Sequence, residues 1–304
     1  MRVLLLTDKK RWAFDSIAQS LVKYNPRKDV DLSILHIKSD LATIRKKHAK
    51  YDRVLVMGWQ NYDVVKFLEP SRTFIGLHSH HSWDDRKTTP ETDVNPPASL
   101  IENLSRFAKV NAVSKRLYDL FKRNGLSNIW YTPNGVDSQM FVPDSHDPQN
   151  PFRIGYSGSK AHDWRKGVSE FIIPSAKAAG VETSLAMLST DDYVPLDEMP
   201  KFYRSIDCYL CASSSEGFSL SVLEAASCGK PIITTKVGGT DELMQDGVNG
   251  FIVPRNVEAM AEKIRSLKDD PQLYRSMSIS MRKHVVDHWC WSKRAVDWIN
   301  FLTK

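Results

Sequence analysis

The chain lacks the features that mark membrane-spanning, secreted or disulfide-stabilised proteins. No apolar run approaches the ~20 residues that are needed to cross a bilayer. The first ten residues, MRVLLLTDKK, are too short and wrongly ordered for a signal peptide, and they are better explained as a first strand. Only four cysteines occur in 304 residues, which favours a reducing compartment. We therefore expect a cytoplasmic protein.

Three compact signatures of cofactor or metal binding are also missing. The turn after the predicted strand at 152–156 carries no G-x-G-x-x-G, which argues against a nicotinamide dinucleotide. Residues 229–231, Gly-Lys-Pro, lack the upstream glycine and the following Ser or Thr of a P-loop. Cys208 and Cys211 have a zinc-like spacing, but no second pair exists and an odd offset on a strand turns two side chains to opposite faces. We predict that both are core cysteines.

The composition that remains is that of an ordinary globular protein. Hydrophobic residues make up 41% of the chain and charged residues 26%, and the length allows two domains with a core in each. The formal net charge of +6 is modest. It is compatible with an anionic nucleotide, with anionic lipids, or with neither.

Apolar runs alternate with amphipathic segments along the chain, as they do in α/β proteins. Strands are predicted at residues 2–7, 32–37, 53–57, 73–77, 110–113, 128–131, 152–156, 183–188, 206–212 and 231–235. Helices are predicted at residues 16–24, 41–50, 64–68, 100–107, 114–123, 168–178, 200–205, 256–267 and 271–286, with one after Ser219 and a last one ending near 302. This alternation predicts parallel sheets, and the polar, proline-bounded segment 144–151 is a good linker.

Residues 213–231, SSSEGFSLSVLEAASCGKP, organise the second half of the chain. Glu216 lies in a loop, Ser219 is a good N-cap, and Glu224 lies about a turn and a half inside the helix that follows. The free N–H groups at that helix start offer a site for a phosphate or a developing anion. Predicted strands flank the stretch, so it belongs at the ligand-binding edge of a doubly wound sheet.

Further motifs lie around this stretch in a fixed order. Glu-x7-Glu in EGFSLSVLEAASCGKPIITTKVGG is followed by GVNGFIVP, and it is preceded by Asn-Ala-Val-Ser at 111–114, Pro-Asn-Gly-Val-Asp at 133–137 and Arg-Lys-Gly at 165–167. Together these motifs resemble the retaining nucleotide-sugar glycosyltransferases of the GT-B fold, family 4, over residues 100–300. The resemblance implies two Rossmann-like doubly wound domains that face a cleft. The expected divisions are an acceptor-binding domain at 1–146, a nucleotide-sugar-binding domain at 147–286, and a C-terminal helix at 287–304 that returns to the first domain.

The resemblance also implies a donor site in the second domain. Glu216 would contact the donor sugar, and Glu224 would accept hydrogen bonds from the ribose hydroxyls. Lys166 would hold the diphosphate together with the backbone at the start of the helix, which comprises Gly217, Phe218, Ser219 and Leu220.

One donor contact differs from the pattern of the family. Family members carry an arginine where this chain has Ser159, so Lys160 or Arg165 is expected to take its place. A lysine ammonium is a poorer bidentate clamp on phosphate than a guanidinium. Tyr193 is a candidate for stacking on the nucleotide base.

In the first domain, the resemblance points to the cleft side of the sheet. Residues 8–12, Asp-Lys-Lys-Arg-Trp, replace the paired-glycine loop of the family. His78 matches the histidine that lines the cleft near the transferred sugar, and His80 is the next candidate. Trp83, Asn134 and Gly135 are further candidates for the acceptor side or the cleft. Residues 84–97 are rich in turn-forming and charged residues, and an acceptor-binding lid explains them as well as an ordinary surface loop does.

Alternatives for the histidine cluster stay open. His-x-His at 78–80 can place two imidazoles on one face of an extended segment, as in a metal hydrolase. The simplest alternative is that these histidines belong to a polar loop in which their hydrogen bonds are satisfied, and this explanation stays open for His81. The order of preference is a cleft histidine, then a polar loop, then a metal site.

The function that we expect from the sequence is transfer of a sugar from a UDP- or GDP-sugar to a glycan, a lipid-linked or another hydroxyl acceptor, with retention of configuration. No cofactor and no metal is expected, since side chains and helix N–H groups do the leaving-group work. The resemblance allows peripheral contact with the inner membrane face. The alternatives are a non-catalytic nucleotide-sugar-binding relative, an enzyme of this fold that glycosylates DNA bases, and a metal hydrolase; a nucleic-acid partner has only thin support from the charge.

Overall fold

The computed structural model describes residues 1–80, 83, 88–188 and 191–304 of the chain. Contacts divide it into two compact units. Unit 1 comprises Met1–Lys87, Val94–Gly135 and Trp291–Lys304, and unit 2 comprises Thr88–Asp93 and Val136–Cys290. Within the described residues, no helix has the length and apolar character that crossing a membrane requires.

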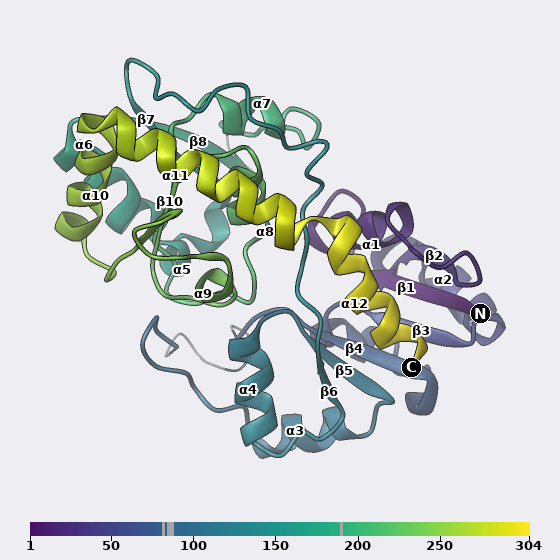
Figure 1. Cartoon of the computed structure of the whole chain (residues 1–304). Coiled ribbons are helices and arrows are strands. Elements are labelled where there is room, and N and C mark those ends of the chain that lie inside the picture. The colour runs from purple at the N-terminus through teal and green to yellow at the C-terminus, as the bar shows by residue number, and fades with distance from the viewer. Residues whose placement is uncertain (81–82, 84–87, 189–190) are drawn as a thin grey trace. The chain divides into compact units, whose positions relative to one another are not determined.

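Unit 1 is built on a six-stranded parallel sheet (Figure 1) with the order β2-β1-β3-β4-β5-β6. Its strands are β1 (Arg2–Thr7), β2 (Asp31–His36), β3 (Arg53–Val56), β4 (Thr73–Leu77), β5 (Lys109–Ala112) and β6 (Ile129–Tyr131). Its helices are α1 (Ala13–Lys23), α2 (Ile37–Lys47), α3 (Ala98–Ser105), α4 (Lys115–Arg123) and α12 (Trp291–Thr303). The apolar run Val3–Leu6 is fully buried, as the central strand of a parallel sheet requires.

The last helix, α12, is part of unit 1 although it is the last element of the chain. The indole Nε1 of Trp298 donates to the carbonyl of Pro133 at 2.9 Å, and Phe301 packs against Phe74 of β4 with ring centroids 5.1 Å apart. Trp298 and Phe301 are both fully buried. Their burial explains why the chain end returns to the first sheet, as predicted.

Unit 2 is built on a five-stranded parallel sheet with the order β11-β10-β9-β7-β8. Its strands are β7 (Arg153–Ser159), β8 (Glu182–Leu188), β9 (Cys208–Cys211), β10 (Ile232–Thr234) and β11 (Gly250–Ile252). Its helices are α5 (Asp163–Lys166), α6 (Ile173–Ala179), α7 (Met199–Arg204), α8 (Leu220–Ser227), α9 (Thr240–Leu243), α10 (Val257–Asp269) and α11 (Pro271–His284). Since β8 lies on one side of β7 and β9 on the other, the strand order reverses between β7 and β9, and this is where doubly wound sheets bind ligands. The predicted α/β architecture is confirmed.

Several predicted boundaries are wrong for local reasons. Helix α1 begins at Ala13 rather than after Ser16, and the carboxylate of Asp15 accepts from the backbone of Arg11 at its start. Residues 64–68 do not form a helix; a 3-10 helix spans Trp59–Val64 instead. Strand β7 runs on to Ser159, three residues past the predicted end, because it pairs with β8 along its full length.

The boundary between the units lies ahead of the predicted linker. The chain passes from unit 1 to unit 2 after Gly135, not after residue 146. The N–H of Val136 donates to the carbonyl of Trp289 at 2.9 Å, and Phe141 packs edge-on against Tyr203. These contacts draw residues 136–146 into unit 2, and the return to unit 1 follows Cys290 rather than residue 286.

Candidate functional site

The site in unit 2 lies where two loops leave the carboxyl ends of β7 and β9. The first loop leads from β7 through the short helix α5, which ends at Gly167 in the left-handed region, with φ of 69°. A side chain at Gly167 would press on Phe171 and Arg255 at 2.8 and 2.9 Å. The second loop leads from β9 to α8 and carries Glu216. The reversal of strand order thus brings together segments that are fifty residues apart.

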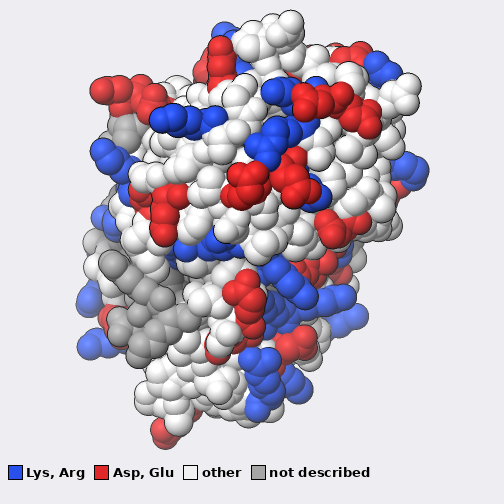
Figure 2. Space-filling model, turned by 90° about the vertical axis from the view of Figure 1, so that its left-hand side faces the viewer, with Lys and Arg blue, Asp and Glu red and all other residues white. Residues whose placement is uncertain are grey.

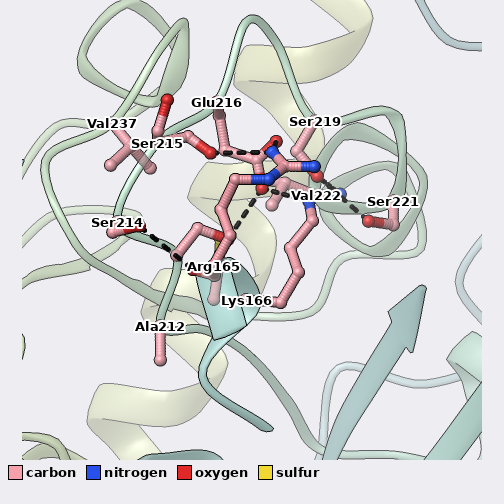
Figure 3. A network of polar contacts seen from close by, with 12 residues as sticks. Arg165, Lys166, Ala212, Ser214, Ser215, Glu216, Ser219, Ser221, Val222 and Val237 are labelled. Carbon is pink, nitrogen blue, oxygen red and sulfur yellow. Dashed lines mark hydrogen bonds and ion pairs between the residues drawn. The ribbon is translucent and has the colours of Figure 1, made fainter. Parts of the chain in front are cut away.

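Glu216 is the centre of a buried ionic cluster in which its carboxylate meets two cations (Figure 3). Lys166 Nζ donates to Oε1, and Arg165 Nη1 lies 3.4 Å from Oε2 and donates to the carbonyl of Ser215 at 2.9 Å. Ser213 Oγ donates to Oε1 at 2.7 Å. Glu216 is 6% exposed and Arg165 7%, so these charges meet largely out of water, where each interaction is strong.

The charges of this cluster set the state of Glu216. Burial by itself would raise the pKa of Glu216, but the charges of Lys166 and Arg165, with the hydrogen bonds from Lys166 and Ser213, lower it to about 2. The carboxylate is therefore ionised at neutral pH. Two cations face one carboxylate, so the cluster carries one net positive charge and attracts anions.

Hydrogen bonds to backbone carbonyls hold the loops that carry the cluster. The N–H of Ser214 donates to the carbonyl of Arg165 at 2.8 Å, Arg255 Nε donates to the carbonyl of Ala212 at 2.8 Å, and Thr235 Oγ1 donates to the carbonyl of Ser213 at 2.6 Å. These bonds join the segments after β7, β9, β10 and β11. The cluster is therefore held in place before any ligand binds.

The start of α8 lies next to Glu216 in the chain. Ser219 caps the helix, with its Oγ accepting from the N–H of Val222 at 3.5 Å, as predicted. The N–H groups of Gly217, Phe218 and Ser219 donate no hydrogen bond within the described part of the chain. Phe218 is buried, and its ring packs against Trp289 with centroids 5.0 Å apart. The backbone donors here are therefore available to an anion.

Glu224 lies on α8, five residues after the cap, and its surroundings differ from those of Glu216. Its Oε2 accepts from the phenol of Tyr203 on α7 at 2.7 Å. Burial raises the pKa of Glu224 to about 7, against the hydrogen bond from Tyr203, which lowers it. The side chain keeps part of its surface exposed. One short segment thus carries two carboxylates with opposite pKa shifts.

Three of the predicted donor residues stand apart from this cluster. Ser159 is the last residue of β7, and Lys160 is exposed and forms no hydrogen bond or ion pair with a described residue. Tyr193 is 54% exposed. Two basic side chains could take the place of the arginine that the family carries at position 159. Of these, Arg165 contacts the carboxylate of Glu216 and Lys160 does not. The loop predicted at 189–195 lies partly outside the described residues.

In unit 1, the predicted histidine, His78, directly follows β4 and is partly exposed, with its Nε2 buried. The ring of His78 lies 4.8 Å from that of Phe14 and 6.3 Å from the indole of Trp298 on α12. Its Nε2 has no hydrogen-bond partner among the described residues, and burial lowers the pKa of His78 to about 3, so the imidazole is neutral.

The other candidates of unit 1 are Asn134, Gly135, His80 and Trp83. Asn134 is buried, and Gly135 lies against the ring of Trp291, which a side chain at that position would meet at 2.9 Å. His80 is buried 5.6 Å from the ring of Trp83, whose Nε1 donates to the carbonyl of Val94. His81 and residues 84–87 of the predicted loop lie outside the described residues.

The sequence also raised a metal site and a nucleic-acid partner as alternatives. Among the residues that the structure describes, no group of three or more His, Cys, Asp or Glu side chains could hold a metal ion. All four cysteines are free and buried, as predicted for Cys208 and Cys211. Basic and acidic side chains are interspersed over most of the face drawn in Figure 2. This mixed face differs from the continuous basic stripe that is typical of duplex binders.

The sequence did not reveal several polar partners at the site. Ser213, which donates to Glu216, lies in a serine run that offers no reason to choose one serine over another. Tyr203, which donates to Glu224, lies on the helix before β9. Neither residue follows from spacing, because each contact depends on how separate elements pack.

The comparisons with known proteins point to one family. Residues 171–284 match the family described as glycosyl transferases group 1. A D-inositol 3-phosphate glycosyltransferase from Arthrobacter sp. (strain FB24) is 31% identical over 296 residues, covering 81% of this chain and 69% of that protein. A GDP-mannose-dependent alpha-(1-6)-phosphatidylinositol monomannoside mannosyltransferase from Mycolicibacterium smegmatis is 28% identical and covers 54% of this chain and 53% of its own length. Matches to three other curated relatives span only 14%, 22% and 23% of their lengths.

Solved structures agree on the fold. HepE from Anabaena, crystallised in complex with UDP and glucose, superposes with a TM-score of 0.76 at 16% identity and covers 100% of this chain and 99% of that one. A sucrose-phosphate synthase from Thermosynechococcus elongatus gives a TM-score of 0.76 at 15% identity, with 99% and 98% coverage. Likeness at such low identity concerns the fold alone.

Proposed function

The chain belongs to the glycosyl transferases group 1 family, and from this membership and the cluster around Glu216 we propose that it transfers a sugar from a nucleotide diphosphate sugar to a hydroxyl acceptor. The anomeric configuration is retained in this proposal. The donor is a UDP- or GDP-sugar, and the acceptor is a glycan, a lipid-linked or another hydroxyl compound. HepE was crystallised with UDP and glucose, and the mycobacterial relative is GDP-mannose-dependent. These names support a nucleotide-sugar donor and leave the base open.

The observation that carries the proposal is the net positive cluster beside free backbone donors. Departure of a nucleoside diphosphate builds negative charge on the leaving phosphate oxygens. The ammonium of Lys166 has three protons, so it can donate to Glu216 and to a phosphate oxygen at once. The N–H groups of Gly217, Phe218 and Ser219 add oriented donors that need no reorganisation. Such preorganised electrostatic stabilisation is worth several kcal/mol in a dry site.

The two acids take different roles in this mechanism. Glu216 holds Lys166 in place and contacts the donor sugar, and it stays ionised throughout. Glu224 accepts the ribose hydroxyls with its two oxygens, which requires the ionised form. His78, as a neutral imidazole, contacts the transferred sugar by hydrogen bonding. No metal is needed in this proposal, because Lys166 and Arg165 supply the positive charge.

Binding of free nucleotides tests the donor site directly. We expect calorimetric titration with UDP and GDP, in EDTA, to detect micromolar binding of one of the two. Glu224→Ala loses that binding, whereas the matched control Glu262→Ala, an exposed glutamate on α10, keeps it. Binding of neither nucleotide by the wild type would refute the donor site. Tight binding without sugar transfer from any UDP- or GDP-sugar to the glycan, lipid-linked and other hydroxyl acceptors offered would support a non-catalytic relative instead.

A further inference from the structure

A chain of hydrogen bonds lies behind Glu224 and connects it to the core of unit 2. Tyr203, on α7, is fully buried, and its phenol is 2.7 Å from Oε2 of Glu224 and 2.8 Å from Oγ of Ser157 on β7. A phenol has one proton, and an ionised carboxylate can only accept. The proton of Tyr203 therefore points to Glu224, and Ser157 donates to the phenol oxygen.

The same chain reaches the start of α8 through a second tyrosine. Tyr209, on β9, lies 3.4 Å from Ser157 Oγ and 2.9 Å from Ser221 Oγ. Ser221 Oγ lies 3.0 Å from Oγ of Ser219, the cap of α8. Five side chains from α7, α8, β7 and β9 thus link Glu224 to the helix start that carries the free N–H groups. The chain fixes two parts of the donor site relative to each other.

We propose that Tyr203 is a positioning residue of the donor site, which holds the carboxylate of Glu224 in the rotamer that accepts the two ribose hydroxyls. The inference rests on the proposed function. The bond from Tyr203 takes one acceptor position on Oε2 and leaves Oε1 and the second position on Oε2 for the ribose. Without Tyr203, the carboxylate would be free to turn, and ordering it would weaken binding.

The phenol also favours the form of Glu224 that can accept hydroxyls. Burial raises the pKa of Glu224 and Tyr203 lowers it. Cys228 after α8 interacts electrostatically with Glu224, and Tyr209 on β9 with Tyr203; burial raises the pKa of both groups, so both stay neutral around pH 7. Removal of the Tyr203 hydroxyl therefore raises the pKa of Glu224 and moves nucleotide binding to higher pH.

The experiment is calorimetry of Tyr203→Phe between pH 6 and 9 with the nucleotide that the wild type binds. We expect the Kd at pH 7 to rise about tenfold, the usual effect of losing one hydrogen bond to a charged group, and the midpoint of the pH dependence to move upward. In turnover, the KM for the donor rises while kcat changes little, since ribose contacts are alike in the ground and transition states. Tyr274→Phe is the matched control, because Tyr274 is a buried tyrosine of unit 2 whose phenol donates to the carbonyl of Asp207.

Each outcome either supports or overturns the positioning role of Tyr203. A Tyr203→Phe variant with the wild-type Kd and pH midpoint overturns the inference while leaving the donor site intact. Equal losses in Tyr203→Phe and Tyr274→Phe, with no pH shift, show a merely structural role and overturn it as well. Should Tyr203→Phe not fold, Ser157→Ala, which removes the donor to the phenol, is expected to move the midpoint in the same direction by less. A wild type that binds neither UDP nor GDP refutes the proposed function and this inference together.

Discussion

Replacing Glu216 with glutamine is the most direct test of the ionic cluster. Glutamine keeps the size of the side chain but removes the charge between Lys166 and Arg165. The pKa of Glu216 falls from 4.5 to about 2 in the folded chain, and a tenfold change in an acid dissociation constant corresponds to about 1.4 kcal/mol. The ionised carboxylate therefore stabilises unit 2 by about 3 kcal/mol relative to its neutral form. We expect Glu216→Gln to lose about this amount at pH 7.

The pH dependence has a definite sign. A carboxyl whose pKa is lowered by folding stabilises the protein above its unfolded pKa, near 4.5, and this stabilisation is lost as the pH falls towards 2. In scanning calorimetry at pH 7, a loss of about 3 kcal/mol lowers the Tm of a unit of this size by roughly 6 to 12 °C. Between pH 5 and 3, the wild type loses stability and approaches Glu216→Gln.

The control and the refuting result use the same calorimetric scan. Glu262→Gln removes an exposed carboxylate on α10, and it should change the Tm at pH 7 by little, because exposed pairs contribute between zero and about 1 kcal/mol. Equal Tm changes in Glu216→Gln and Glu262→Gln, or an unchanged acid dependence in Glu216→Gln, would show that Glu216 is not held by a buried ion pair.

Three further predictions concern binding and turnover. Nucleotide affinity should rise with pH through about 7 in the wild type, where Glu224 ionises, and titration calorimetry of Glu224→Gln should find weak binding at every pH. His78→Phe should leave nucleotide Kd unchanged but lower kcat about tenfold or more, measured as sugar release; a wild-type kcat would remove His78 from the reaction. Gly239→Ala would place a methyl group 2.0 Å from the ring of Phe218 and so displace the start of α8. Calorimetry should find weaker nucleotide binding than in Gly247→Ala, where the backbone is strained at a φ of 74° but the methyl group meets open space.

The sheets were predictable because the signals for buried parallel strands are local. The apolar run at 73–77 forms β4 with the predicted bounds, and Ser114 and Ser219 cap the helices that follow them. The wrong predictions fall where local signals compete. Residues 64–68 are apolar at helical spacing, but a 3-10 helix ends at Val64 just before them, and β7 is lengthened by its neighbour β8 rather than by its own composition.

The members of the site were predictable in part, and their contacts were not. Glu216, Lys166 and Glu224 follow from the motifs of the resembling family. The sequence suggested that Lys166 faces a diphosphate, and nothing in it indicated that the ammonium also contacts Glu216, fifty residues away in the chain. That pair depends on β7 and β9 being neighbours in the sheet. Tyr203 depends likewise on the packing of α7 against α8.

The two carboxylates show why environment rather than motif decides chemistry here. Both are glutamates on one segment, yet cations lower the pKa of Glu216 to about 2 while burial raises that of Glu224 to about 7. Glu216 is therefore a constant charge at any physiological pH, and Glu224 alone titrates near neutrality. It follows that the part of a change in nucleotide affinity near pH 7 that Glu224→Gln removes reports on Glu224, and the part of a stability loss between pH 5 and 3 that Glu216→Gln removes reports on Glu216. One pH series on the wild type and the two glutamine variants, measured by nucleotide binding and by thermal unfolding, separates the roles of the two acids.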